Sequence, residues 1–366
     1  MDLEKRITMT DIANLARCSQ STVSVVLNPN AKVKISKATT ERVLKAAAVL
    51  GYRVEPPTKK RPSTSRKVAV IFDDLSVCPE AVISVDGVRE ATWGTGDIVA
   101  AYNCHGDAQM EARTIEAAID AGSAAIIYAT VRTREIDPSP LLVETSVPVV
   151  LLNCYTANHE FPAVLAGDVA GGNRATTLLI GAGHRRIAHI TGEGWMDVSM
   201  DRNRGYREAL ATADIPFDPA LVYEGNWQLS SGYEGTLSLM TLKRPPTAIF
   251  CSNDKMALGC YEALKQLGLR IPDDVSVIGF DDEEIASHVM PKLTTLRFPR
   301  HEMGVWAIER ALATPRVAGE IHRITKLECE LVERDSVGPG PAAGTHLSKP
   351  RHASMAPATR RRATIA

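Results

Sequence analysis

The 366-residue chain is poor in aromatic residues and in cysteine. Aromatic side chains make up 5% of the sequence, and the seven cysteines are scattered, without a Cys-x-x-Cys pair. An odd, unclustered set of thiols is typical of reduced core residues in a cytoplasmic protein, because it gives neither a disulfide framework nor a zinc site. The chain also lacks a run near the roughly 18 apolar residues of a membrane span, and its first residues lack the apolar segment of a secretion signal. We therefore expect a cytoplasmic protein with no membrane association.

Motifs of catalysis and of cofactor binding are missing as well. The Gly-x-Gly fragments at 94–96 and 181–183 are not part of a full dinucleotide fingerprint, and there is no Lys-containing phosphate loop and no Gly-x-Ser-x-Gly motif. The nine histidines show no zinc-ligand spacing. The acidic run at 281–284 could hold a metal, but a helix start after a strand is the simpler interpretation. The sequence predicts neither an enzyme nor a cofactor or metal site.

The N-terminal residues predict two short helices arranged as a helix-turn-helix. Thr8 can cap the first helix, with Asp11 at the acidic position of a capping box, and Ser19 can cap the second. The apolar positions that would pack the two helices together are Ile12, Ala13, Leu15, Ala16, Val23, Val26 and Leu27. The second helix would then present its first residues to the major groove of DNA. An ordinary helical hairpin with a basic flank is the alternative.

The charges of the chain are divided unevenly. Residues 1–67 hold 14 Lys/Arg against 5 Asp/Glu, whereas residues 68–336 hold 23 against 38. A basic head points to a polyanionic partner, since neutralisation of phosphates supplies most of the non-specific affinity for DNA. A solvated basic surface would explain the charge but not its coincidence with the helix pair. A third helix from Ser36 to about Leu50 would complete a head domain of residues 1–53.

From residue 68 onward, short aliphatic runs alternate with helical stretches. This alternation predicts parallel sheets with helical crossovers, and two successive series of runs suggest two similar lobes. The expected strands are 68–72, 97–102, 124–129 and 148–153, followed by 186–191, 220–225, 247–253 and 275–282. Residues 54–67 are rich in proline and predict a linker, and residues 337–366 predict a disordered basic tail. A ligand is expected between the lobes, at the carboxyl ends of the strands.

Further motifs are spread along the chain. In the head these are Thr10-Asp-Ile-Ala, Cys18-Ser-x-x-Thr22-Val-Ser and Leu50-Gly-Tyr52. In the body they are Gly183-His-Arg-Arg-Ile-Ala, Arg202-Asn-Arg-Gly205-Tyr, Ser252-Asn-Asp254-Lys-Met-Ala and Val275-Ser-Val-Ile-Gly-Phe-Asp281-Asp. They occur in collinear order between about residues 7 and 336, and this order is more specific than any single motif. Together they resemble the motifs of LacI/GalR-type transcription regulators.

The resemblance implies an α/β fold with an N-terminal helix-turn-helix head and a two-lobed, periplasmic-binding-protein-like effector domain with parallel sheets. It places that domain at residues 68–336, with three crossovers between the lobes. The first lobe would hold residues 68–161 and 291–318, and the second lobe residues 162–290 and 319–336.

The resemblance also implies a function. We expect a sequence-specific DNA-binding transcriptional regulator, by default a repressor, that reads a near-palindromic operator as a homodimer or a tetramer. Two heads on a symmetric dimer would supply the contact area that one head of about fifty residues lacks. A small polar effector, expected to be a carbohydrate, would bind in the cleft and change operator affinity. Control by a protein partner, and activation instead of repression, are the open alternatives.

The second helix carries the residues expected to read DNA. Gln20 and Ser21 are candidates for base-edge contacts, since a glutamine amide pairs well with adenine. Val25, where the family often carries arginine, could touch a thymine methyl group. The residues expected to hold phosphates or caps are Thr10, Ser19, Thr22, Ser24 and Asn28.

Two positions depart from the family pattern. Arg17 occupies the turn between the helices, where the family commonly has glycine, and a left-handed conformation there would cost on the order of 1 kcal/mol. The linker has Arg61, flanked by Pro62, where the family carries the leucine of a hinge helix that wedges into the minor groove. These residues do not favour a full hinge helix, and we hypothesise that Arg61 inserts into a narrow minor groove instead.

In the cleft, the family pattern carries over to Arg202, Trp227, Asn253 and Asp281, and also to Asp168, although Val169 follows it in place of the usual Asn. Charged side chains would bond vicinal hydroxyl groups of a sugar while the indole covers its C–H face. Phe298 and the loop Asp73–Pro79 would line the opposite lobe. A strand-end ion pair is the alternative for Asp281, and ordinary core packing is the alternative for Trp227.

Overall fold

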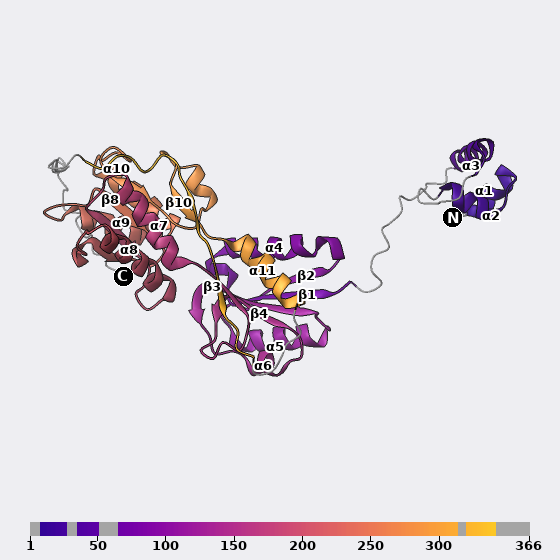
Figure 1. Cartoon of the computed structure of the whole chain (residues 1–366), viewed down its shortest axis with the longest axis horizontal. Helices are drawn as coiled ribbons and strands as arrows, with labels where there is room; N and C mark the ends of the chain where they lie inside the picture. The colour runs from indigo at the N-terminus through magenta and orange to yellow at the C-terminus, as the bar shows by residue number, and fades with distance from the viewer. Residues whose placement is uncertain (1–7, 28–34, 51–64, 314–319, 342–366) are drawn as a thin grey trace, which may run out of the picture. The chain divides into compact units, whose positions relative to one another are not determined.

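The structure, a computed structural model, describes residues 8–27, 35–50, 65–313 and 320–341 (Figure 1). The chain divides into two compact units, the head at Met1–Ser65 and the body at Arg66–Ala366. In the described part of the chain, no helix is both long enough and apolar enough to cross a bilayer.

The described part of the head consists of three helices, α1 (Met9–Ala16), α2 (Gln20–Leu27) and α3 (Lys37–Val49). The predicted capping box at the start of α1 is confirmed: Thr8 accepts the N–H of Asp11, and the Asp11 carboxylate accepts the N–H of Thr8. Ser19 accepts the N–H of Thr22, as predicted for the cap of α2. The three helices share a small core of Ile12, Ala13, Ala16, Val23, Leu27, Val43, Ala46 and Ala47. Leu15, expected in this core, is 51% exposed, which corrects that assignment.

The turn between α1 and α2 requires the strained conformation that the sequence had suggested. Arg17 has φ 50° and ψ 55°, which is left-handed, and its N–H closes the C-terminus of α1. The left-handed conformation raises the free energy of a residue with a Cβ, whereas glycine adopts it without this cost.

The first lobe of the body is built on a six-stranded parallel sheet with the order β11-β5-β4-β3-β1-β2. Its strands are β1 (Lys67–Phe72), β2 (Ile98–Asn103), β3 (Ala125–Glu135), β4 (Val149–Tyr155), β5 (Ala163–Ala166) and β11 (Ile324–Leu327). Helices α4 (Ile83–Thr92) and α11 (Arg300–Ala313) cover one face, and α5 (Ala108–Asp120) and α6 (Pro140–Glu144) cover the other (Figure 1). Short 3-10 helices lie at Leu75–Val77, Pro79–Val82 and Trp93–Thr95.

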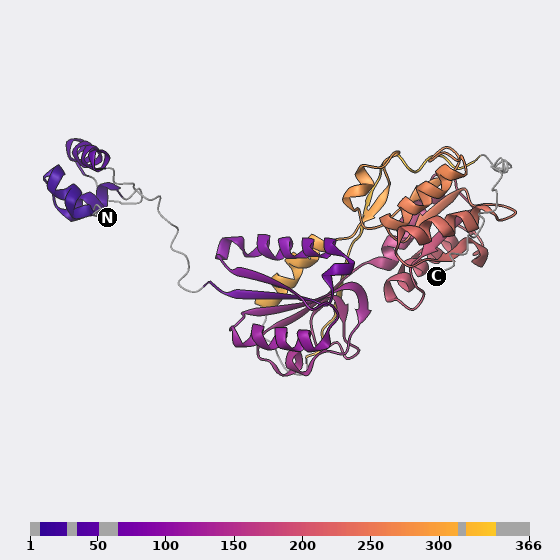
Figure 2. The same cartoon turned by 180° about the vertical axis from the view of Figure 1, so that it is seen from behind.

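The second lobe contains a four-stranded parallel sheet with the order β7-β6-β8-β9. Its strands are β6 (Ile187–Thr191), β7 (Val222–Glu224), β8 (Ala248–Cys251) and β9 (Ser276–Ile278). Helices α7 (Asp168–Gly181) and α8 (Asp197–Thr212) pack on one face, and α9 (Leu229–Met240) and α10 (Asp254–Gln266) pack on the other. Figure 2 shows this layering from behind. Two further 3-10 helices lie at Pro219–Leu221 and Glu284–Ser287.

Three segments connect the lobes, and their positions correct the expected boundaries. β5 joins the first sheet, so the first crossover follows Ala166 and not residue 161. Residues 291–297 belong to the second lobe, because Leu293 is buried in its core and β10 (Thr295–Arg297) pairs with β12 (Glu330–Val332). Residues 324–327 form β11 of the first sheet, although the sequence had placed them in the second lobe.

The start of the C-terminal tail also needs correction, because residues 337–341 pack against the second lobe. The carbonyl oxygen of Gly338 lies 3.2 Å from Nε2 of His184, and the N–H of Gly340 donates to the carbonyl oxygen of Ala182 at 2.7 Å. The predicted disorder of residues 342–366 lies outside the described residues.

Candidate functional sites

The first turns of α2 present polar side chains on the outside of the head. Gln20, Ser21 and Ser24 are exposed, and Val25 is half-buried. The Ser19 hydroxyl lies 2.8 Å from the hydroxyl groups of Ser21 and Thr22, so it fixes the start of the helix as a cap. Thr10 is exposed in the first turn of α1. Of the other predicted DNA contacts, Asn28 and Arg61 lie outside the described residues.

The body brings most of the predicted effector residues together at the carboxyl ends of the second-lobe strands. Arg202 on α8 is buried, and its Nε donates to Asp168 Oδ1 at 2.8 Å. Its guanidinium stacks on the ring of Phe280 at 3.5 Å, and its Nη2 lies 3.8 Å from Asp281 Oδ1. Burial raises the pKa of Asp168 even though Arg202 opposes this shift. The guanidinium is therefore fixed in place before any ligand binds.

Asn253 and Trp227 form a second part of this cluster. Asn253 Oδ1 accepts the N–H of Met256 at 2.9 Å, and its Nδ2 donates to the carbonyl oxygen of Trp227 at 3.0 Å. The Asn253 side chain thus caps α10 and holds the backbone of Trp227. The indole packs so closely on Gly192 that a Cβ there would lie 2.0 Å from a ring carbon. Trp227 is half-buried and also packs against the core of the second lobe.

Three residues of the two lobes have unusual backbone conformations. Asn153, within β4 of the first lobe, has φ 61°, and after the ends of second-lobe strands Trp227 has φ 66° and Asp281 has φ 112°. Such conformations are unfavourable for residues with a side chain and persist where the surrounding structure holds them, often at ligand sites. Asp281, with the most unusual value, also bears the carboxylate that faces two guanidinium groups.

In the first lobe, the predicted residues have structural partners. The carboxylate of Asp73 accepts the N–H groups of Asp74 and Val131 at 2.7 and 3.0 Å, and it lies 3.0 Å from Arg134 Nη2. Asp73 therefore shapes its loop. Phe298 is half-buried between the cores of the two lobes, and the guanidinium of Arg300 stacks on its ring at 4.6 Å.

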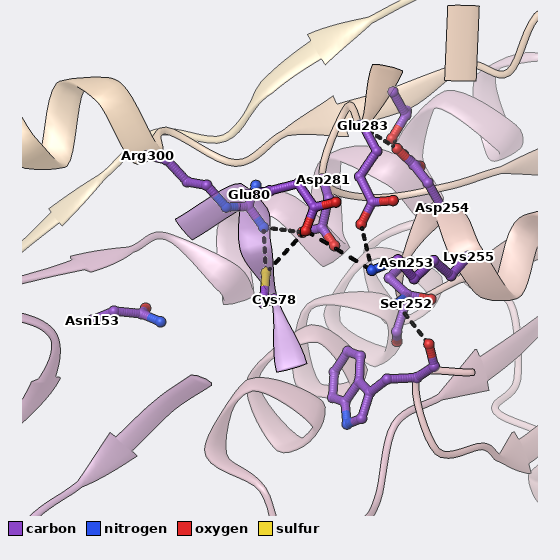
Figure 3. Close-up of polar contacts among 12 residues, drawn as sticks. Cys78, Glu80, Asn153, Ser252, Asn253, Asp254, Lys255, Asp281, Glu283 and Arg300 are labelled. Atoms are coloured by element: carbon purple, nitrogen blue, oxygen red, sulfur yellow. Dashed lines mark hydrogen bonds and ion pairs between the residues drawn. The ribbon is translucent and has the colours of Figure 1, made fainter. Parts of the chain in front are cut away.

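The structure adds a set of cross-cleft residues that sequence reasoning missed (Figure 3). Arg300 of the first lobe lies 3.8 Å from Asp281 Oδ1 and 3.8 Å from the sulfur of Cys78. Lys255 of the second lobe lies 3.9 Å from Glu80 of the first lobe and 3.6 Å from Glu283 of its own lobe. These distances make the six residues a group, because they come from four separate segments of the chain, at 78–80, 255, 281–283 and 300.

The sequence held two signals for this group, the acidic run at 281–284 and the loop Asp73–Pro79, which contains Cys78. A 3-10 helix does begin at Glu284, as the simpler interpretation had it, but Asp281 and Glu283 just before it line the cleft. Burial, assisted by the nearby Asp281 charge, raises the pKa of Glu283 to about 6.

A helix-turn-helix head joined to a two-lobed body with a polar cleft defines the class of ligand-responsive DNA-binding regulators. The comparisons with known proteins agree. Residues 8–55 match the family described as "Bacterial regulatory proteins, lacI family", and residues 176–337 match a "Periplasmic binding protein-like domain".

Relatives match over nearly their whole length. The chain is 31% identical to the ribose operon repressor of Haemophilus influenzae over 330 residues, which is 90% of this chain and 98% of the relative. It is 32% identical to the HTH-type transcriptional repressor CytR of Escherichia coli K12, over 91% of this chain and 97% of the relative.

Solved structures give the same picture. The complex of the transcriptional regulator CelR with cellobiose matches with a TM-score of 0.62 and 28% identity, covering 90% of this chain and all of that one. The lac repressor dimer bound to operator and the anti-inducer ONPF matches with a TM-score of 0.61 and 25% identity, over 91% of this chain and all of that one. The chain belongs to the LacI family of bacterial regulatory proteins, whose members regulate transcription.

Proposed function

We propose that the chain is a cytoplasmic repressor of transcription that binds a near-palindromic operator as a homodimer under the control of a small polar effector. The observation that carries the effector role is the cluster of the buried Arg202 with Trp227 and Asp281, two residues held at positive φ after the ends of strands. The proposal assigns no catalytic step to this cluster.

In the head, α2 would be the recognition helix. Gln20 and Ser21 are exposed at its start, which suits contacts to base edges, and half-buried Val25 suits contact with a thymine methyl group. The residues that would hold DNA phosphates are Thr10, Ser19, Thr22 and Ser24. The Ser19 hydroxyl already bonds the hydroxyl groups of Ser21 and Thr22, so it would contact a phosphate while it caps the helix. For Asn28 and Arg61 the sequence alone supports a role.

In the cleft, the effector would bond Arg202 and Asp281 through hydroxyl groups, and the indole of Trp227 would cover an apolar face. Asp168 would hold Arg202 through one carboxylate oxygen and offer the other to the effector, and Asn253 would act as a positioning residue through the Trp227 backbone. Phe298 would line the first-lobe side. A carbohydrate suits this chemistry, and the names of the ribose operon repressor and the CelR–cellobiose complex point the same way.

The first lobe offers a surface for the proposed dimer. Strand β2 is at the edge of the six-stranded sheet, where Ile98 is 57% exposed and Tyr102 is 39% exposed. Trp93, just before this strand, is 80% exposed. An apolar edge strand is normally covered by another chain, and a second copy of this chain is the partner that symmetric operator recognition needs.

The effector can control operator affinity only by favouring one arrangement of the lobes over another. Contacts between the lobes give it this opportunity, since they exist only at one lobe separation. Arg300 faces Asp281 at 3.8 Å, and the Tyr155 hydroxyl donates to Asp197 at 2.8 Å. An effector bonded to Asp281 would change the first of these contacts directly.

Selection of DNA fragments by the purified chain, followed by sequencing, tests the proposal. We expect the retained fragments to share a dyad. A screen of sugars should then find a compound that changes operator affinity by roughly 5- to 150-fold, the usual range of such coupling. Retained fragments without a common dyad would contradict symmetric recognition.

A further inference from the structure

Among the described residues, the buried side-chain atoms without a hydrogen-bond partner are all oxygens. They are Thr156 Oγ1, Asp168 Oδ2, Glu193 Oε2 and Ser199 Oγ. Buried polar atoms in folded proteins are nearly always paired, so each of these calls for an explanation. Two of them are carboxylate oxygens, which accept, and two are hydroxyl oxygens, which can donate or accept, so each of the four can take a hydrogen bond from a donor group of a ligand.

All four oxygens lie just past the carboxyl end of a strand. Thr156 follows the last residue of β4, and Asp168 stands two residues after the end of β5. Glu193 and Ser199 belong to the segment that leads from β6 into the first turn of α8. Parallel sheets bind their ligands at these ends of the strands.

Contacts place three of the four oxygens, those of Ser199, Asp168 and Thr156, near the effector cluster. Ser199 Oγ and the Trp227 ring both lie beside Gly192. A Cβ added to Gly192 would lie 2.6 Å from Ser199 Oγ and 2.0 Å from a carbon of the Trp227 ring. The second oxygen of the Asp168 carboxylate is the unpaired one, because Arg202 bonds the first. The bond between Tyr155 and Asp197 brings the end of β4, next to Thr156, to the start of α8.

The charges of the cleft point the same way. Among the described residues, the ion pairs of Asp281, Glu80 and Glu283 are with Arg300, Lys255 and, for Asp281, also Arg202, which already pairs with Asp168. Four carboxylates thus share three cations. Asp281 is reached by guanidinium groups at 3.8 Å on both sides, which leaves room for a donor of the effector to bond it more closely.

We propose that the effector is a donor-rich compound without negative charge, a neutral polyol or an amino polyol, and that this cleft rejects sugar phosphates and sugar acids. The inference rests on the proposed function of the same cleft. Hydroxyl or ammonium hydrogens would supply donors to the unpaired oxygens of Asp168, Ser199 and Thr156. A phosphate or carboxylate group would add acceptors and negative charge where both are already in excess.

Binding of matched probes to the full-length chain tests the charge rule. The neutral and amino probes are ribose, cellobiose, a ribonucleoside and glucosamine, and the anionic probes are ribose 5-phosphate and glucuronate. We expect binding, measured by calorimetry and thermal shift, to be confined to the first set. Tightest binding by an anionic probe would overturn this inference and leave the proposed function standing. No binding by any probe, together with no effect on operator affinity, would overturn both.

Two variants test the role of the unpaired oxygens. Ser199→Ala and Thr156→Val remove hydroxyl groups that have no partner, so the Tm without effector should stay unchanged or rise. The Kd of the best probe should rise about fivefold for each, as expected for the loss of one hydrogen bond.

Ser276→Ala is the matched control. The Ser276 hydroxyl is also buried in the second lobe, but it lies 3.0 Å from His184 Nε2 and accepts the N–H of Gly338 at 3.0 Å. Its removal should lower the Tm and leave the Kd of the probe unchanged. If Ser199→Ala and Thr156→Val instead lower the Tm and spare the Kd, internal water and not the effector satisfies these oxygens, and the inference is wrong.

Discussion

Arg300 of the first lobe and Asp281 of the second lobe face each other across the cleft, with Nη2 and Oδ1 3.8 Å apart. Arg202 approaches the same oxygen at 3.8 Å from within the second lobe. The Asp281 carboxylate thus lies between a cation that is fixed beside it and a cation that moves when the lobes separate. This arrangement makes Asp281 the residue through which ligand contact and lobe position are coupled.

Asp281→Asn should uncouple effector binding from operator release. An amide cannot accept from the effector with the strength of a carboxylate, and hydrogen bonds to charged groups contribute about 1.5–3 kcal/mol. We expect the effector concentration that gives half-release to rise at least about tenfold, with the effector-free operator Kd within about threefold of wild type. Fluorescence anisotropy of labelled operator measures both.

Asp282→Asn is the control for this substitution, since the Asp282 carboxylate lies 2.6 Å from Arg334 Nη2. Asp282→Asn should lower the free energy of unfolding and leave the response to the effector unchanged. Equal loss of response in the two variants would argue against a special role of Asp281.

The pKa of Glu283 predicts a pH dependence of stability. Burial raises this pKa from 4.5 to about 6, so the folded chain holds the proton more tightly than the unfolded chain does. The resulting stabilisation is complete below pH 4.5 and is lost as the pH rises through 6. After allowance for screening by solvent, we expect it to be about 1 kcal/mol.

Glu283→Gln should remove this dependence. Between pH 7.5 and pH 5, the free energy of unfolding of the wild-type chain should rise by about 1 kcal/mol more than that of the variant. Urea unfolding at each pH measures this difference. Glu284→Gln is the neighbouring control, because the Glu284 side chain is 91% exposed. A pH response of Glu283→Gln identical to that of wild type would show that another group is responsible.

Much of the fold could be predicted from local sequence patterns. The caps at Thr8 and Ser19 are set by contacts within three residues, and the long aliphatic runs gave eight strands of the two main sheets. The four residues of β5 and the short β10, β11 and β12 were missed because such brief segments form only by pairing with distant strands. The lobe boundaries were misplaced for the same reason.

The site was predictable only where residues lie near recognisable motifs. Arg202, Asn253 and Asp281 were found in this way, but the motif did not reveal that Asn253 holds the Trp227 backbone. Arg300 and Lys255 could not be identified, because their partners Asp281 and Glu80 come from the opposite lobe. Long-range ion pairs of this kind leave no periodic signal in a sequence.

Arg17→Gly should stabilise the head. Glycine adopts the left-handed conformation at φ 50° without strain, which should stabilise the fold by about 1–2 kcal/mol. The greater freedom of glycine in the unfolded chain should offset about 0.5–1 kcal/mol of this stabilisation. We expect a net gain of about 0.5–1 kcal/mol, measured as slower hydrogen exchange of the α1 and α2 amides. Arg17→Ala removes the same charge without relieving the backbone and should show no gain. If both variants slow exchange equally, the effect comes from charge and not from the turn.

Gln20→Ala should relax sequence specificity, whereas Thr10→Val should weaken binding uniformly. A glutamine amide bonded to adenine discriminates by about 1–3 kcal/mol, so Gln20→Ala should raise the Kd for the operator by roughly 5- to 150-fold and change the Kd for shuffled DNA little. Thr10 is exposed at the start of α1, and a phosphate contact there carries no sequence information. Anisotropy titrations of both variants on both DNAs separate the two roles. A parallel loss on operator and shuffled DNA for Gln20→Ala would show that Gln20 contacts the backbone and that base reading lies elsewhere on α2.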